Sequence, residues 1–352
     1  MTTAAPTTFM RREIAEQPAA IAGTLQTLRP LADDLRRVAR DCRQVLFIAR
    51  GSSDNAAVYG QYLCSIRGGR LATLASPSVA TTYRASVDLS GVLAVAVSQS
   101  GATEEIVEAM DWARGCGART VAVTNVAGSP LATDADVALV TQAGHEQAVP
   151  ATKTYTTQLA ALAVLGLTLG DGALSELDAV PDAVADALSA APAAEALAER
   201  LTYLDRLVVT GRGYASTTAL EIALKLKEAC YVSASGLSYA DLLHGPIAVV
   251  DPATPALLVA AADGPVLPGM VALTGRLAGI GAHVYGIGGD PAFVAACRTA
   301  LPGTALPEHL APMALIVPGQ LLVEALARAK GIDPDAPRGL RKVTQTDSRP
   351  GG

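Results

Sequence analysis

The 352-residue sequence has few aromatic side chains, no closely spaced cysteines and no long uninterrupted hydrophobic run. Its five cysteines are odd in number and never form a Cys-x-x-Cys pair, which argues against a disulfide framework or a zinc ribbon. The N-terminus lacks the apolar core of a signal peptide, and the apolar run near residues 159–169 is shorter than the roughly 20 residues of a spanning helix. We therefore expect a cytoplasmic protein with no membrane partner.

A run of basic residues is also missing. The chain carries 27 Lys and Arg against 33 Asp and Glu, which gives a formal net charge of −6. This balance argues against a nucleic acid partner but leaves room for a small anionic ligand in a local pocket. The four histidines (His145, His244, His283 and His309) are dispersed, without an HxxxH pattern or paired carboxylates. We therefore predict no metal site and no cofactor.

Half of the residues are hydrophobic, which is enough for a large core, and the length suggests two domains of ordinary size. From Val45 onward, apolar runs, Gly/Ser turns and helical stretches alternate. This alternation is typical of parallel β-α units with helices on both faces of the sheet. Strands are expected at 45–49, 92–97, 120–125 and 138–141, followed by a long buried helix within 148–169.

A second series of β-α units begins near residue 206. The stretch RLVVTGRGYASTTALEIALKLKE aligns with VLFIARGSSDNAAVYGQYL at an offset of 162, so that Arg212-Gly213 falls on Arg50-Gly51. We interpret this match as an internal duplication. Further strands are expected at 256–262 and 282–287, and a last helix at 321–329. The predicted fold class is α/β, with two doubly wound parallel sheets of the flavodoxin-like kind.

The predicted domain limits follow from these patterns. They are a helical arm over 1–29 that is broken around Pro18, a first domain over 30–175, a helical connector over 176–198, a second domain over 199–332 and a polar tail over 333–352.

Two β-to-α turns of the first domain are rich in hydroxyl groups: Gly51-Ser52-Ser53 and Ser98-Gln99-Ser100-Gly101-Ala102-Thr103. Free N–H groups and the positive dipole end of a helix, together with neutral hydroxyl donors, suit a phosphate without requiring a lysine. For either turn alone, simple N-capping is an equally good explanation. Two such turns on adjacent units favour ligand binding, because ligands of parallel sheets gather beyond the carboxyl ends of the strands. The duplicated turn at 213–215 lacks the paired serines, which predicts one phosphate site per chain.

The stretch from Glu221 to Pro246, EIALKLKEACYVSASGLSYADLLHGP, combines a polar-faced helix with a turn-rich segment that ends in His-Gly-Pro. At 100° per residue, Glu221, Lys225 and Glu228 fall within about 60° of one another, apart from an apolar stripe. This face is either a solvated ion pair worth roughly 0.2–0.5 kcal/mol or a cluster that performs chemistry.

The motifs strand–GSS–helix and strand–SQSGAT–helix, followed in order by EIALKLKE, LLHGP and the terminal LRKVTQT, resemble the sugar isomerase (SIS) domain family over nearly the whole chain. The similarity is greatest to the SIS-type glucosamine-6-phosphate deaminases and to the isomerase half of the glutamine–fructose-6-phosphate aminotransferases. The resemblance implies two SIS domains related by duplication.

The resemblance also implies roles for individual residues. The sugar phosphate would be held by Ser53, Ser98, Gln99, Ser100 and Thr103, with further substrate contacts at Gly51, Ser52, Val149, Ala151 and Thr152. Glu228 would be the base that moves a proton between C2 and C1, with Glu221 and Lys225 as its neighbours. His244 would open the pyranose ring, from the partner subunit of a homodimer with shared active sites. Lys342 would contact or condense with the open-chain sugar.

These residue types suit aldose–ketose interconversion. One carboxylate on one face of the sugar can remove a proton beside a carbonyl or iminium and return it to the adjacent carbon. A histidine exchanges protons near neutrality, which suits ring opening. Phosphate binding remote from the reacting carbons can fix the position of the sugar for proton transfer.

The choice within the family rests on three features. No cysteine precedes Cys42, so we expect no glutaminase domain and favour an enzyme that converts glucosamine 6-phosphate and water to fructose 6-phosphate and ammonia. Leu243 and Ala151 replace the usual lysine and serine of the aminotransferases, so substrate contacts can differ. The alternatives are an isomerase or deglycase acting on a related amino-sugar phosphate, an aminotransferase-like enzyme without a glutaminase, and a non-catalytic phosphosugar sensor.

Overall fold

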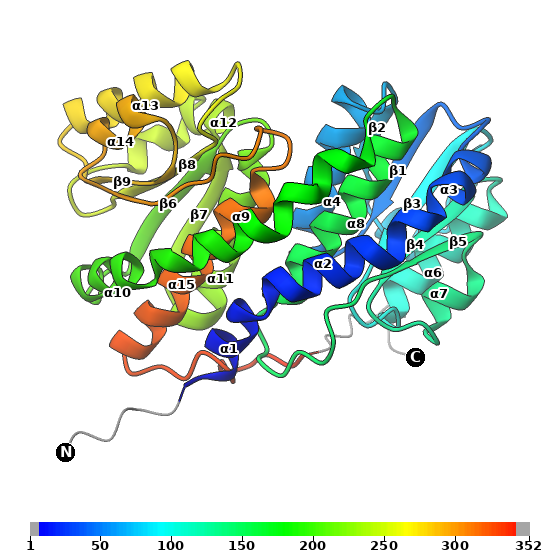
Figure 1. Cartoon of the computed structure of the whole chain (residues 1–352), viewed down its shortest axis with the longest axis horizontal. Coiled ribbons are helices and arrows are strands. Elements are labelled where there is room, and N and C mark those ends of the chain that lie inside the picture. Colours follow the sequence, from blue (N-terminus) through cyan, green and yellow to red (C-terminus); the bar gives the residue numbers. More distant parts are fainter. Residues whose placement is uncertain (1–6, 343–352) are drawn as a thin grey trace. The chain divides into compact units, whose positions relative to one another are not determined.

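The computed structural model describes residues 7–342, which form two compact units. Unit 1 contains described residues 7–18, 146–152 and 179–342, and unit 2 contains residues 19–145 and 153–178. Each unit has one five-stranded parallel sheet covered by helices (Figure 1). The α/β class with parallel sheets is therefore confirmed.

Unit 2 contains the first sheet, whose strands pair in parallel in the order β2-β1-β3-β4-β5. The strands are β1 (Gln44–Ile48), β2 (Leu71–Leu74), β3 (Val92–Val97), β4 (Arg119–Thr124) and β5 (Val137–Val140). The helices are α2 (Gln17–Leu28), which begins in unit 1, α3 (Ala32–Val38), α4 (Ser52–Ile66), α5 (Ser78–Thr81), α6 (Glu104–Gly115), α7 (Pro130–Asp134) and α8 (Lys153–Leu169), with 3-10 turns η1 (Arg29–Leu31) and η2 (Leu174–Ala179).

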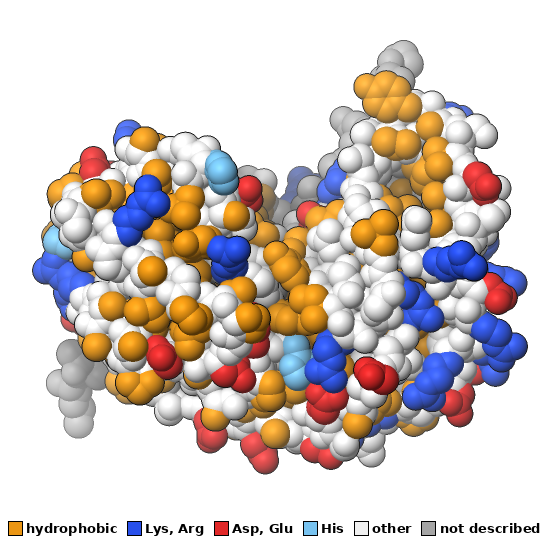
Figure 2. Space-filling view, turned by 90° about the horizontal axis from the view of Figure 1, so that it is seen from above, with side chains coloured by type: hydrophobic (Ala, Val, Ile, Leu, Met, Phe, Trp, Pro, Cys, Tyr) orange, Lys and Arg blue, Asp and Glu red, His pale blue; other side chains and the backbone are white. Residues whose placement is uncertain are grey.

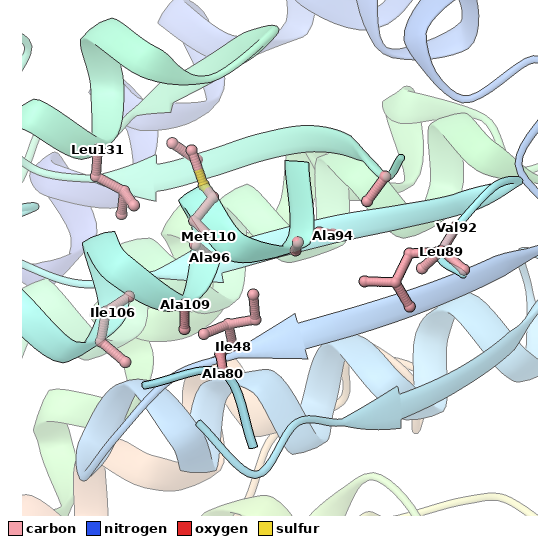
Figure 3. Packing of buried hydrophobic residues seen from close by; sticks show 13 residues of the cluster. Ile48, Ala80, Leu89, Val92, Ala94, Ala96, Ile106, Ala109, Met110 and Leu131 are labelled. Carbon is pink, nitrogen blue, oxygen red and sulfur yellow. The ribbon is translucent and has the colours of Figure 1, made fainter. Parts of the chain in front are cut away.

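The core of unit 2 is continuous because its central strands are apolar on both faces. Every residue of β3 is buried, as expected for a parallel strand with helices on both sides. Figure 3 shows one of these faces, where Ile106, Ala109 and Met110 of α6 meet Ile48 of β1 and the alanines of β3. Helix α8 is buried along its whole length and packs against α4.

Unit 1 contains the second sheet, with parallel strands in the order β10-β9-β8-β6-β7. Its strands are β6 (Arg206–Gly211), β7 (Ser233–Ser238), β8 (Ala256–Ala260), β9 (Val284–Gly288) and β10 (Thr299–Leu301). Its helices are α1 (Phe9–Ala15), α9 (Val180–Ala187), α10 (Ala191–Arg200), α11 (Ala215–Cys230), α12 (Tyr239–Leu243), α13 (Leu267–Gly279), α14 (Pro291–Ala296) and α15 (Pro312–Ala329), with 3-10 turns η3 (Leu188–Ala190) and η4 (Pro246–Val249).

Helix α15 is the central helix of unit 1 and packs against α10 and α11. Within the described residues it is the one helix long and apolar enough to cross a membrane, and 89% of it is buried inside the protein. Such burial is that of a core helix. A second core cluster on the same unit joins α13 to β8 and β9 through side chains that include Met270, Leu258 and Val284.

Most elements lie where the sequence predicted them, with boundaries shifted by a few residues. The break in the N-terminal arm lies at Glu16, between α1 and α2, and the buried helix of 148–169 begins at Lys153. The segment after α11, predicted as turn-rich, contains the strand β7, which was not predicted. The short strands β2 and β10 were also missed. The last helix begins at Pro312 rather than at residue 321.

Counted outward from β1 and β6, the two sheets have the same strand order. Unrelated doubly wound proteins also share this order, so the internal duplication stays a prediction. The predicted domain limits stay predictions in the same way.

On the face drawn in Figure 2, positive and negative side chains are interspersed with uncharged and hydrophobic ones. This mixture agrees with a sequence that has no run of basic residues.

Candidate functional site

In unit 2, the two hydroxyl-rich turns lie at the carboxyl ends of β1 and β3, which are neighbours in the sheet. An ion pair with two hydrogen bonds joins them: Arg50 Nε lies 3.0 Å from Glu105 Oε2, and Arg50 Nη2 lies 2.9 Å from Glu105 Oε1. Arg50 precedes the first turn and Glu105 lies in the first turn of α6. The predicted phosphate residues of both turns are therefore brought together.

The simple N-capping explanation of these hydroxyls is wrong at the two helix starts. Gly51 is the N-cap of α4 and Thr103 is the N-cap of α6, and neither helix has a side-chain capping hydrogen bond. Instead, Thr103 Oγ1 lies 3.4 Å from Ser98 Oγ, and Ser53 Oγ accepts a hydrogen bond of 3.0 Å from Gln158 Nε2. Neither helix start is therefore capped by the side chain of its N-cap residue, and the positive dipole ends of both helices face the two turns.

The second turn is held in shape by its backbone. The Gln99 carbonyl accepts hydrogen bonds from Asn125 N at 3.0 Å and from Thr124 Oγ1 at 3.3 Å, and Ser100 Oγ accepts one from Ala102 N at 3.2 Å. Gly101 has a φ of +60°, and a Cβ at this position would lie 2.1 Å from Ser129 Oγ. Both its conformation and its surroundings require glycine.

In unit 1, helix α11 carries the three predicted acid–base residues, and two of them are buried. The side chains of Glu221 and Lys225 are 0% and 1% exposed, and Lys225 Nζ lies 3.5 Å from Glu221 Oε1. Lys225 also forms an ion pair and a hydrogen bond with Glu228, whose side chain is 22% exposed. A surface ion pair is thereby excluded, and Glu228 is the member of the three that a ligand can reach.

The three charges depend on one another. Burial by itself lowers the pKa of Lys225, but the carboxylates of Glu221 and Glu228, and more weakly Glu146, outweigh it and raise the pKa above its ordinary value. The lysine therefore stays an ammonium, which keeps a positive charge beside the side chain of Glu228.

A second charged group of unit 1 lies on the loop 146–152, which also carries Val149, Ala151 and Thr152. Glu146 is buried, accepts hydrogen bonds from Thr152 N at 2.9 Å and Thr152 Oγ1 at 3.1 Å, and forms an ion pair with Lys342. Lys342 Nζ also donates to Ala148 O at 2.7 Å. The predicted tail lysine is thus fixed on the loop that carries the predicted substrate contacts.

Two predicted features, His244 and the terminal motif, are not part of the clusters described above. His244 follows α12 and is exposed, and its backbone N–H donates to Asp241 O at 3.1 Å. Within residues 7–342, no hydrogen bond or ion pair joins its imidazole to the charged cluster. The stretch Val343–Thr346 of the terminal motif lies outside the described residues.

Sequence reasoning missed several residues of these sites. Glu146 and Glu105 are ordinary acids in the sequence, and Gln158 lies in an apolar helix. Of these residues, Gln158 alone could have been found from the sequence, because a polar residue inside an apolar helix needs a hydrogen-bonding partner. For metal binding, no group of three or more His, Cys, Asp or Glu side chains is suitably placed among the residues that the structure describes.

Comparisons with known proteins agree with this arrangement. Residues 40–167 match the family model described as the SIS domain. A glutamine–fructose-6-phosphate aminotransferase of Thermococcus kodakarensis is 34% identical over 345 residues, which are 95% of this chain and 57% of that protein. The chain therefore spans a little over half the length of this relative.

Two solved structures cover nearly all of this chain. A protein from Silicibacter pomeroyi, provisionally assigned as a phosphosugar isomerase, is 33% identical with a TM-score of 0.84, and the match covers 94% of this chain and 100% of that one. The C-terminal domain of glucosamine-fructose-6-phosphate aminotransferase from Francisella tularensis is 26% identical with a TM-score of 0.85, over 96% and 100%. Since sequence motifs, both parallel sheets and full-length similarity agree, the chain belongs to the SIS domain family.

Proposed function

We propose that this protein is a phosphosugar isomerase that converts glucosamine 6-phosphate and water to fructose 6-phosphate and ammonia. The observation that carries the proposal is the partly exposed carboxylate of Glu228, held beside the buried ammonium of Lys225. A carboxylate that a ligand can reach, fixed in place by an ion pair, suits proton transfer next to a carbonyl.

In this proposal Glu228 removes the proton from C2 of the open-chain amino aldehyde and delivers it to C1. The product is an imine at C2 with a CH₂OH group at C1. Water then adds to C2, and ammonia leaves, which gives the ketone of fructose 6-phosphate. Glu221 and Lys225 are too buried to touch the sugar. We therefore assign to them the role of holding the side chain of Glu228 in position.

Phosphate binding is assigned to the two turns of unit 2. Ser53, Ser98, Gln99, Ser100 and Thr103 provide hydroxyl and amide groups beside two helix N-termini, which can hold a dianion without a lysine. Remote binding energy of this kind is best used to orient the reacting carbons. Gly51, Ser52, Val149, Ala151 and Thr152 are proposed as further substrate contacts.

The roles of His244 and Lys342 are proposed from the family resemblance. His244 opens the pyranose ring and acts from the partner subunit of a homodimer, which suits an exposed imidazole. Lys342 contacts or condenses with the open-chain carbonyl. The cytoplasm remains the proposed compartment.

A second candidate is supported by the similarity to the Thermococcus kodakarensis relative, whose name is that of an aminotransferase. In that case the same proton transfer runs from an imine of fructose 6-phosphate toward glucosamine 6-phosphate. A phosphosugar sensor is the candidate of another class, and a buried charge cluster beside a reachable carboxylate is unnecessary for binding alone.

The decisive assay incubates the pure protein with a panel of phosphorylated amino sugars and measures ammonia and ketose release. We expect turnover of glucosamine 6-phosphate. In parallel, fructose 6-phosphate in D₂O should gain deuterium at C1 if ammonia is supplied. Turnover of another amino sugar, with silence on glucosamine 6-phosphate, would overturn the substrate, and binding without turnover of any sugar would favour the sensor.

The role of Glu228 is tested by Glu228→Gln, which keeps the shape of the side chain and removes the base. We expect kcat to fall about 10²–10⁴-fold while product binding persists. Lys227→Gln, an exposed change on the same helix, is the matched control and should keep full turnover. Full turnover of Glu228→Gln would show that the proton-transfer assignment is wrong.

A further inference from the structure

The tail of the chain is tied down at successive points within unit 1. The carboxylate of Asp335 accepts hydrogen bonds of 2.7 Å from the N–H groups of both Phe9 and Met10, at the start of α1. The carbonyl of the same residue accepts one of 2.9 Å from Val149 N. Residues 335–342 therefore run between α1 and the loop 146–152.

The next fixed point lies at the end of the helix that carries Glu228. Arg338 N donates to Tyr231 Oη at 2.8 Å, and the Arg338 guanidinium lies 4.3 Å from the centre of the Tyr231 ring. Tyr231 is the left-handed C-cap of α11, three residues beyond Glu228. The tail thus reaches Lys342 along a route set by α1, the loop and α11.

The last fixed point is Glu146. Its carboxylate is 0% exposed, pairs with the 25% exposed side chain of Lys342, and is close enough to Lys225 to act on its charge. Breaking a buried ion pair leaves an uncompensated charge, so the carboxylate of Glu146 holds the ammonium of Lys342 in place. Its other hydrogen bonds, from Thr152 N and Oγ1, fix the direction in which it faces.

The loop that carries Glu146 is held in turn by the N-terminal helix. Glu13 of α1 is buried, and its two carboxylate oxygens accept hydrogen bonds from the N–H groups of Gln147 and Ala148. Ala148 is also the residue whose carbonyl accepts from Lys342. Both acceptors of the Lys342 ammonium, Glu146 and Ala148, therefore lie on the loop that the carboxylate of Glu13 holds.

From these contacts we infer that Glu146 is a positioning residue that sets the ammonium of Lys342 for the reaction, and that Glu13 fixes the loop from which it does so. The inference rests on the proposed function for the role of Lys342 and on the observed contacts for its position. It assigns the N-terminal helix α1, which has no chemistry of its own, to the support of the site.

Two measurements on Glu146→Gln test this inference. The first is turnover, for which we expect kcat to fall about 100-fold with KM within about threefold, because a misplaced group costs rate rather than binding. The second is trace acetylation of lysine amines followed by peptide mass spectrometry. We expect Lys342 to acetylate several-fold faster in Glu146→Gln, with Lys330 in the same sample as an internal reference.

The matched control is Glu324→Gln. Glu324 is equally buried, lies in the same unit, and pairs with Arg328 and with Thr8 and Arg11 at the start of α1. Among the described residues, no hydrogen bond or ion pair joins it to Lys225, Lys342 or the loop 146–152. It should leave kcat and Lys342 acetylation unchanged. Glu146→Asp keeps the charge and should recover part of kcat, and Glu13→Gln should change both measurements in the same direction as Glu146→Gln.

The outcomes separate this inference from the proposed function. Wild-type kcat and wild-type Lys342 acetylation in Glu146→Gln would overturn the inference, as would equal losses in Glu324→Gln. If Glu146→Gln does not fold, unchanged Lys342 acetylation in Glu13→Gln overturns it instead. If wild-type protein turns over no sugar, the proposed function fails, and faster acetylation in Glu146→Gln still supports the placement of Lys342.

Discussion

Lys225 and Glu221 form an ion pair inside the protein, with Nζ 3.5 Å from Oε1 and both side chains essentially inaccessible to solvent. One turn of helix further on, the same ammonium pairs with Glu228, which solvent reaches. The buried ammonium of Lys225 is thus in contact with one carboxylate, that of Glu228, that lies at the surface of unit 1. A buried ion is stable only while its partner stays charged. Lys225 therefore contributes both to the stability of the fold, through Glu221, and to the candidate site, through Glu228.

The first prediction concerns this coupling. Lys225→Met leaves Glu221 buried without its ammonium, and we expect the free energy of unfolding to fall by about 3–5 kcal/mol. The measurement is urea denaturation followed by circular dichroism. The double variant Glu221→Gln/Lys225→Met removes both charges and should recover most of the loss, whereas equal instability of single and double variants would contradict the account.

The second prediction concerns the ion pair between the two turns of unit 2. Arg50→Lys keeps the charge but cannot make both hydrogen bonds to Glu105, so the turns separate and Glu105 is left closer to an incoming phosphate. We expect KM for the sugar phosphate to rise about tenfold, equivalent to about 1.4 kcal/mol, with kcat little changed.

The control for Arg50→Lys is Arg114→Lys, which makes the same change in an exposed pair with Asp111 on α6. It should leave KM unchanged. A rise in KM of the same size in both variants would mean that the effect is general rather than local to the turns.

The third prediction uses two glycines with the same backbone conformation. Gly69 and Gly101 both have a φ of +60°, but a Cβ at Gly69 meets open space, whereas one at Gly101 would collide with Ser129 and Thr124. Gly69→Ala should cost about 1–2 kcal/mol of unfolding free energy from the left-handed conformation. Gly101→Ala should cost about 1–3 kcal/mol more from the collision. Equal losses, measured by thermal denaturation, would show that the second turn is not tightly packed.

The fourth prediction concerns buried thiols. Burial raises the pKa of Cys64 and Cys230 to about 12, so roughly one molecule in 10⁴ carries the thiolate at pH 8. We expect both to resist alkylation in the native protein, while the partly exposed Cys116 reacts. All five should react after denaturation. Rapid native alkylation of Cys64 or Cys230 would show that these parts of the core open readily.

The raised pKa values of Cys64 and Cys230 also predict that the protein loses stability as the pH rises. Because the folded state favours the neutral thiol, their contribution is fully present below the ordinary thiol pKa of about 8.5. It is lost as pH rises toward about 12, where the buried thiols must ionise. Replacing Cys64 or Cys230 by serine should flatten this alkaline decline, measured as Tm against pH.

The fifth prediction separates ring opening from proton transfer. His244→Asn should lower turnover of glucosamine 6-phosphate about 10²–10⁴-fold, because the ring must open before C2 can react. An analogue of fructose 6-phosphate without the 5-hydroxyl group cannot close its furanose ring, so with ammonia supplied its deuterium exchange at C1 should be unaffected. Loss of exchange with this analogue as well would give His244 a different role.

The sequence predicted the central strands well because each is a short apolar run between turn residues. β1, β3, β4, β8 and β9 were all recognised in this way. The strands that were missed, β2, β7 and β10, are all at sheet edges. Edge strands bury fewer side chains, so their pattern is weak. β2 and β10 are also short, with four and three residues, and β7 reads SASGLS, in which Ala234 alone is buried.

For the candidate site, the motif residues were visible in the sequence, but their environment was not. Helical spacing alone placed Glu221, Lys225 and Glu228 on one face, yet it could not tell a solvated face from a buried one. The packing of α11 against α15 decided that question. Likewise, the sequence allowed the hydroxyls of Ser53 and Thr103 to cap their helices, but in the structure their partners are the side chains of Gln158 and Ser98.

The sequence by itself determined the fold class, the family and the residues that carry the proposed chemistry, because these depend on local periodicity and on motifs in order along the chain. Only the tertiary structure decided which other residues support them. Glu146 is 196 residues from Lys342, and Glu13 is 135 residues from Ala148. Contacts over such separations are set by chain packing, and no spacing in the sequence records them.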